Sequence, residues 1–235
     1  MDIFKIKFVI ILMVIKMHKI DTVLFDLDGT LVDSNELIIK SFDETMKKYL
    51  PEREFSRMEL IEMIGPPLQE TFSIASTNQA VIDEMIVYYR EVYVRLEFDY
   101  VKIYPNTIEM LKTLSENNFN LGIVTTKFKR SAMPSIKHYG LDKYITSYCF
   151  LDDISEHKPH PEPIFFALNQ FKDYNNVIMV GDNSSDILAG RNASALTCGV
   201  NWSIKKDLIK SLNPDFWIND FSDLIKIIND FNKEE

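Results

Sequence analysis

The sequence has few cysteines, and they are far apart. Of its 235 residues only Cys149 and Cys198 are cysteines, in neither a metal-binding nor a redox spacing. Such sparse thiols suit a reducing compartment, so we predict a cytoplasmic protein. We expect both thiols to pack in or beside strands and to be unreactive.

An excess of positive charge is also missing. The formal net charge is -9, which argues against a nucleic acid or an anionic membrane as the main partner. An anionic substrate would therefore need a local cluster of donors. The hydrophobic share of 46% and the charged share of 26% are ordinary for a soluble globular protein, and the length suits one large domain or a domain with an insertion.

No apolar run is long enough to cross a membrane. The apolar run at residues 8–15 is flanked by lysines and is much shorter than the ~20 residues that a spanning helix needs. No small-residue cleavage site follows it, which disfavours a secretory leader. We expect residues 1–17 to be an N-terminal extension, disordered or not translated, with Met17 as the working start. A membrane-surface anchor is the alternative interpretation, and no stable membrane association is expected.

The chain also lacks internal repeats, and strand patterns are missing from residues 35–99. That segment shows helical spacing over 35–49 and 79–96, with a capping box at Ser56–Glu59 between them. We predict an all-helical insertion there. Residues 18–34 and 100–235 instead alternate strands and helices, which predicts an α/β core domain with a parallel sheet and helices on both faces.

The most informative stretch of the sequence is residues 23–33, around which the other motifs are organised. A short apolar run ends in Asp26 and Asp28, and Gly29 follows. The run predicts a buried parallel strand, at whose end the two carboxylates leave on the same face. Gly29 lets the chain turn away from them. An acidic turn alone is an equally good interpretation of this motif, but buried carboxylates this close are costly unless a cation or a transferred proton shares their site.

Polar side chains follow three further predicted strands. These residues are Thr125, Thr126 and Lys127 after 120–125, Lys158 after 145–151, and Asp182, Asn183 and Asp186 after 177–180. Each alone is explained as a helix cap or a loop charge. In parallel sheets, however, ligands bind beyond the carboxyl ends of the strands, so four such sets together predict one site.

The four motifs resemble those of the haloacid dehalogenase-like superfamily of phosphohydrolases. They stand at 26–30 (DLDGT), 124–126 (VTT), 157–163 (HKPHPEP) and 181–186 (GDNSSD), and the resemblance extends from Ile20 to about Phe231. It implies a Rossmann-like sheet and makes 35–99 a helical cap domain, as in the subfamily that includes phosphoglycolate phosphatases.

The resemblance also implies roles for these residues. Asp26 would be the nucleophile and Asp28 the general acid and base. Thr125, Thr126 and Lys158 would bind phosphate, with Gly29, Asn183 and Asp186 in support. Mg²⁺ would be held by Asp26, Asp182 and the main-chain oxygen of Asp28.

These roles predict a Mg²⁺-dependent phosphohydrolase that works through an aspartyl-phosphate. Residues 35–38, 64–68 and 151–153 are most similar to a bacterial pyrophosphatase group, which makes inorganic pyrophosphate the expected substrate. Ser184 and Ser185 depart from that group, in which bulkier residues are expected. Phosphoglycolate or another small phosphomonoester is the alternative substrate, and a sugar-phosphate mutase or a catalytically silent regulatory module on this fold are further alternatives.

Overall fold

The structure, a computed structural model, describes residues 19–233. The predicted extension at residues 1–17 lies outside them. The chain divides into two compact units, one containing the described residues up to Thr30 and from Pro105 onward, the other Leu31–Tyr104. No helix of the described part is long and apolar enough to cross a membrane.

The first unit is built on one six-stranded sheet in the order β5-β4-β1-β6-β7-β8. All of its strand pairs are parallel, which confirms the predicted α/β class. The strands are β1 (Ile20–Phe25), β4 (Asn120–Val124), β5 (Ser147–Cys149), β6 (Asn176–Gly181), β7 (Leu196–Val200) and β8 (Phe216–Ile218). β1 lies between β4 and β6, with Phe25 paired to both Ile123 and Val180.

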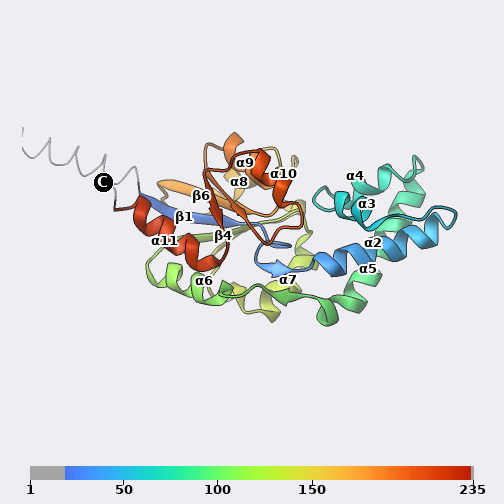
Figure 1. Ribbon diagram of the computed structural model, residues 1–235, viewed down its shortest axis with the longest axis horizontal. Coiled ribbons are helices and arrows are strands. Elements are labelled where there is room, and N and C mark those ends of the chain that lie inside the picture. The colour runs from blue at the N-terminus through green and yellow to red at the C-terminus, as the bar shows by residue number, and fades with distance from the viewer. Residues whose placement is uncertain (1–18, 234–235) are drawn as a thin grey trace, which may run out of the picture. The chain divides into compact units, whose positions relative to one another are not determined.

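Helices cover the sheet on both faces, which explains why the second half of its central strand is a continuous apolar run. Figure 1 shows α6 (Thr107–Glu116) and α11 (Phe221–Phe231) on one side of the strands, and α8 (Glu162–Leu168), α9 (Ser184–Asn192) and α10 (Lys206–Ser211) on the other. Val23, Leu24 and Phe25 of β1 are completely buried. A strand buried on both faces needs such a continuous hydrophobic run.

Two local predictions need correction. The strand expected over 145–151 is shorter, because Leu151–Asp153 form a 3₁₀ turn in which Asp153 accepts the Phe150 N–H at 2.9 Å. Because proline fits a helix best in the first turn, the sequence predicts Pro134 there, yet α7 (Lys129–His138) begins five residues earlier. An interior proline costs a backbone hydrogen bond. We attribute its tolerance here to packing, because the neighbouring Ala132 and Ile136 side chains are completely buried.

The second unit consists of four helices and a short ribbon. The helices are α2 (Asn35–Tyr49), α3 (Arg57–Glu62), α4 (Leu68–Ser73) and α5 (Gln79–Tyr100), and α2 and α4 both pack against α5. Phe42, Phe72 and Tyr89 form its aromatic core. The expected capping box is present, since Ser56 and Glu59 bond reciprocally. β2 (Val32–Asp33) pairs antiparallel with β3 (Lys102–Ile103), a ribbon that the periodicity did not indicate.

Candidate active site

Three of the predicted site residues each come directly after the last residue of a central strand. Asp26 follows β1, Thr125 follows β4 and Asp182 follows β6. Parallel neighbours bring these carboxyl ends to one edge of the sheet. The backbone N–H of Asp26 donates to the carbonyl of Val180 at 2.9 Å, and that of Thr125 donates to Cys149 at 3.0 Å. β1 is also where the strand order reverses direction, the usual place of a ligand site in open α/β sheets.

Lys158 is the buried cation of this edge. Its residue is only 5% exposed, and its ammonium nitrogen donates to Oδ1 of Asp26 at 2.7 Å, to Oδ1 of Asp186 at 2.6 Å and to the carbonyl of Val124 at 2.9 Å. An ammonium group has three hydrogens to donate, and these three bonds use them all. Burial by itself lowers the pKa of Lys158, but the Asp186 and Asp26 carboxylates outweigh burial and raise it above its usual range. The group therefore stays charged and holds two carboxylates in place.

Asp186 is held on its other oxygen by the start of α9. Its Oδ2 accepts the backbone N–H of Asn183 at 2.9 Å, and the Asn183 side chain in turn accepts from Ser185 in a capping box. Both carboxylate oxygens of Asp186 thus have fixed donors. The close approach depends on Gly181, where an added Cβ would lie 2.2 Å from the Cβ of Asp186.

Asp182 lies against the turn that follows Asp28. Gly29 has a φ of 81°, a conformation that favours glycine, and an added Cβ there would lie 2.2 Å from Oδ2 of Asp182. The hydroxyl of Thr30 donates to Oδ1 of Asp182 over a long 3.4 Å, while Ser203 donates to its backbone carbonyl at 2.7 Å. Gly29 is therefore required twice, by its backbone conformation and by its contact with Asp182.

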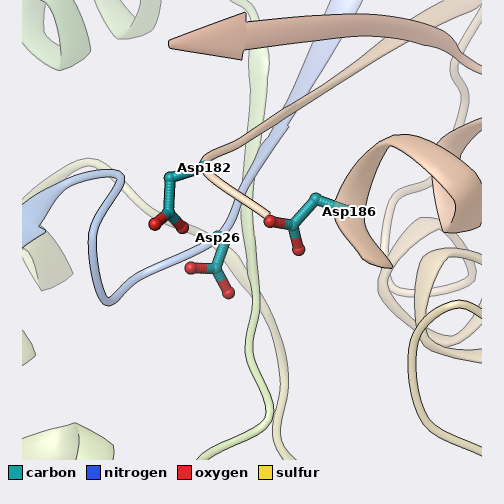
Figure 2. A group of neighbouring side chains, drawn as sticks. All are labelled: Asp26, Asp182 and Asp186. Atoms are coloured by element: carbon teal, nitrogen blue, oxygen red, sulfur yellow. The ribbon is translucent and has the colours of Figure 1, made fainter. Parts of the chain in front are cut away.

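Three buried carboxylates converge, as Figure 2 shows. Oxygen atoms of Asp26, Asp182 and Asp186 lie within 4.8 Å of one another. Burial, together with the charges of Asp186 and Asp28, raises the pKa of Asp26 to about 7 against the opposing effect of Lys158. Burial, followed by the charge of Asp26, also raises the pKa of Asp182 well above its usual value. Burial is the first cause of both shifts, so it is costly to keep these carboxylates ionised in the cluster.

The donor set fits a metal ion. Four carboxylates lie at this edge, those of Asp28 and of the cluster, and within residues 19–233 the ammonium groups of Lys158 and Lys127 form ion pairs with three of them. A bound cation would relieve that excess, and oxygen-only ligands suit a hard divalent ion. The predicted metal ligands were Asp26, Asp182 and the main-chain oxygen of Asp28. The carboxylate cluster contains the first two, and the Asp28 oxygen stays a prediction.

Thr125, Thr126 and Lys127 form the turn after β4. The Thr125 hydroxyl oxygen accepts the backbone N–H of Lys127 at 3.2 Å, so its own hydrogen remains for donation to a ligand. Thr125 is buried and Thr126 is half-buried. The ammonium nitrogen of Lys127 lies 3.2 Å from Oδ2 and 3.4 Å from Oδ1 of Asp28. Each of the two aspartates after β1 thus contacts its own lysine.

Comparison with known proteins assigns the family. The family model of the haloacid dehalogenase-like hydrolases matches residues 23–200. A protein named Pyrophosphatase PpaX from Listeria welshimeri is 44% identical over 216 residues, which are 90% of this chain and 98% of the relative. Another protein of that name, from Bacillus pumilus, is 42% identical over 89% of this chain and 96% of its own length. The chain belongs to the haloacid dehalogenase-like hydrolases, and it is an enzyme of that family.

Solved structures agree with the family on the fold. A haloacid dehalogenase-like family hydrolase from Streptococcus pneumoniae superposes with a TM-score of 0.75 at 25% identity, covering 88% of this chain and 98% of that one. A hydrolase from Pseudomonas syringae, only 20% identical, superposes with a TM-score of 0.76 over 89% of this chain and 98% of its own. Because its identity to this chain is low, the similarity to the Pseudomonas syringae hydrolase supports the fold alone.

Sequence reasoning missed several contacts that shape the site. Trp202 donates from its indole nitrogen to the carbonyl of Gly29 at 3.1 Å, and Ser203 holds the backbone of Asp182. Both residues follow β7, whose sequence is the weakest strand pattern of the core, and no motif marks them. The sequence also could not predict that the Val124 carbonyl is the third acceptor for Lys158, since every residue has a carbonyl.

Proposed function

We propose that this protein is a Mg²⁺-dependent phosphohydrolase whose substrate is inorganic pyrophosphate, and that it acts through an aspartyl-phosphate on Asp26. The observation that carries the proposal is the position of the Asp26 carboxylate. One of its oxygens is held by Lys158 at 2.7 Å, within a buried acidic cluster at the carboxyl end of the central strand. A nucleophile needs such fixed geometry.

The first chemical step forms a bond between Asp26 and phosphorus. The second carboxylate oxygen, Oδ2, attacks the phosphorus atom while the bond to the bridging oxygen breaks. The bridging oxygen leaves with the electron pair of that bond and takes a proton from Asp28. This in-line displacement asks the protein for positioning and charge neutralisation more than for further covalent chemistry.

The second step returns the enzyme to its starting state. Asp28, now ionised, takes a proton from a water molecule as that water attacks the phosphorus of the aspartyl-phosphate. The bond between Asp26 and phosphorus breaks, phosphate leaves, and both aspartates recover their initial protonation. Asp28 therefore serves first as the acid and then as the base.

Asp26, Asp182 and the main-chain oxygen of Asp28 are the proposed Mg²⁺ ligands. When bound, Mg²⁺ supplies positive charge that offsets the repulsion between Asp26 and an anionic substrate. Asp186 has a different proposed role. Since both of its oxygens have donors already, it keeps Lys158 oriented toward Asp26.

The hydroxyl of Thr125, together with Thr126, is proposed to donate to the transferring phosphoryl oxygens. Lys158 is proposed to act on the same oxygens, although its three hydrogens are committed to protein acceptors. Its contribution is therefore the positive potential that it adds at the site, while it holds the nucleophile.

Pyrophosphate as the substrate rests on the relatives. Proteins named Pyrophosphatase PpaX at 44% and 42% identity match nearly the whole of this chain. We propose that residues 35–99 act as the cap domain that selects the substrate. Cytoplasmic location is proposed from the two unpaired cysteines, Cys149 and Cys198.

The test is phosphate release by the purified protein with Mg²⁺, measured with pyrophosphate, phosphoglycolate and glucose 6-phosphate. The highest kcat/KM is expected with pyrophosphate, and Asp26→Asn should lose activity by about three orders of magnitude or more. Acid quenching with labelled pyrophosphate should trap a covalent phosphoprotein only when Asp26 is present.

An Asp230→Asn variant serves as the control, because this exposed residue lies in α11 at the surface. Higher kcat/KM with phosphoglycolate or glucose 6-phosphate would keep the mechanism and reject pyrophosphate. Mg²⁺ binding without phosphate release from any substrate would reject the enzyme and favour a regulatory module.

A further inference from the structure

We propose that Lys127 binds the leaving group of the substrate and makes the enzyme prefer leaving groups that carry their own negative charge. The inference rests on the proposed function and adds a specificity determinant to it. It starts from the contact between the Lys127 ammonium group and Asp28, at 3.2 Å and 3.4 Å from the two carboxylate oxygens.

The position of Lys127 follows from its backbone. Its N–H donates to the Thr125 hydroxyl at 3.2 Å, and its carbonyl accepts the N–H of Leu151 at 2.9 Å. A backbone held on both sides gives its side chain a defined direction. The side chain of Lys127 is only 16% exposed, so its charge lies within the site rather than in solvent.

The neighbouring cations do not share this position. Lys129 and Arg130 also follow β4, but both are exposed. The guanidinium of Arg130 lies over the ring of Phe128, 5.7 Å from its centroid. Of these three cations, the structure therefore selects Lys127.

The two buried-site lysines differ in how firmly they are held. Lys158 has three acceptors at 2.6–2.9 Å, two of them aspartates. The contacts of the Lys127 ammonium nitrogen with Asp28, at 3.2 Å and 3.4 Å, are longer. Longer hydrogen bonds are weaker, so an ammonium group at these distances exchanges or shares its acceptor at a lower cost in free energy. Lys127 is therefore the better suited of the two to donate to an arriving anion.

Its place beside Asp28 indicates which part of the substrate it meets. Asp28 gives its proton to the bridging oxygen, so a cation in contact with Asp28 lies on the side from which the leaving group departs. In pyrophosphate the leaving group is itself a phosphate, whose charge rises as the bond to the bridging oxygen breaks. Lys127 transfers no proton in this step. It stabilises that charge, which a sugar alcohol as the leaving group does not carry.

The experiment compares kcat/KM for pyrophosphate, phosphoglycolate and glucose 6-phosphate in the wild type and in Lys127→Met. The first two substrates have anionic leaving groups, and the third has a neutral one. We expect Lys127→Met to lose about 10- to 100-fold in kcat/KM with the anionic pair, the usual effect of losing a hydrogen bond to a charged group, and at most about threefold with glucose 6-phosphate.

Two further variants control this comparison. Lys129→Met, which removes an exposed lysine two residues away, should leave all three values unchanged, and Lys127→Arg should restore part of the loss with the anionic pair. An equal loss with all three substrates would overturn the inference, because it would mean that Lys127 acts only by positioning Asp28. So would unchanged values in Lys127→Met.

The outcomes also separate this inference from the proposed function. A wild type that prefers phosphoglycolate rejects pyrophosphate as the substrate, while the ratio of anionic to neutral leaving groups in Lys127→Met still decides the role of the lysine. A wild type that releases phosphate from none of the three rejects both.

Discussion

The ammonium nitrogen of Lys158 lies 2.7 Å from Oδ1 of Asp26, and both side chains are buried. The two residues are 132 positions apart in the chain and come together because the strands before them end at the same edge of the sheet. Asp186 completes the arrangement at 2.6 Å from the same nitrogen. One cation thus neutralises part of the charge of two buried carboxylates.

Replacing Lys158 with methionine should therefore destabilise the fold. The substitution leaves Asp26 and Asp186 without their buried cation, and breaking a buried ion pair from one side costs about 3–5 kcal/mol. Urea unfolding at pH 7 without metal measures this free energy. Adding Asp186→Asn to Lys158→Met should recover part of it, because one unpaired charge is removed. A double variant no more stable than the single one would contradict this account.

Asp182 should make the metal-free protein less stable as the pH rises. Burial raises the pKa of Asp182 well above its usual value, and burial raises that of Asp26 from 3.8 to about 7. The folded protein therefore holds these protons at a pH where the unfolded chain has lost them. For Asp26, this stability is complete below about pH 4 and is lost as the pH rises through about 7, and the raised pKa of Asp182 acts in the same direction.

The measurement compares the free energy of unfolding of wild type and Asp182→Asn at pH 5 and pH 8 in EDTA. The free energy of unfolding of the variant, relative to that of the wild type, should be higher at pH 8 than at pH 5, since the amide of the variant never becomes charged. Mg²⁺ at pH 8 should raise the melting temperature of the wild type much more than that of the variant. An identical difference at both pH values would show that the Asp182 carboxylate bears no charge penalty in the fold.

Gly29→Ala should disturb the position of Asp182. The added Cβ would lie 2.2 Å from Oδ2 of Asp182, and the φ of 81° at this residue is strained for alanine. We expect a loss of about 1–3 kcal/mol in stability, together with weaker Mg²⁺ binding by calorimetry. The matched control is Gly140→Ala, since Gly140 also has a positive φ, 67°, but the atoms nearest to its added Cβ belong to the Lys143 side chain, 3.4 Å or more away. The control should lose stability without any change in metal binding.

The two cysteines should be inert in the folded protein. Cys149 in β5 and Cys198 in β7 are completely buried. Burial raises the pKa of the Cys149 thiol to about 12 and raises that of Cys198 above its usual range. Because only the thiolate reacts, iodoacetamide at pH 8 should label neither residue until urea unfolds the protein. Labelling of the native protein at a rate close to that of a free thiol would contradict the burial of these strands.

Much of the fold was predictable because its signals are local. The helix at 35–49 and the cap at Ser56 follow from apolar spacing and side-chain chemistry within a few residues. The β2–β3 ribbon was not predicted, since two-residue strands carry no periodicity of their own. Pro134 lies in the interior of α7 because packing of neighbouring side chains outweighs a local preference.

For the site, the sequence by itself determined which residue types follow each strand, and thereby Asp26, Asp28, Thr125, Lys158 and Asp182 as candidates. Only the tertiary structure decided their partners. In the folded chain, Lys158 contacts both Asp26 and Asp186. Lys127, rather than Lys129 or Arg130, lies beside Asp28. Asp182 packs against Gly29. The physical reason is that the chemistry of a side chain depends on the residue itself and its near neighbours in the chain. The distances between strand ends depend instead on the order and register of the sheet, whose strands are far apart in the chain.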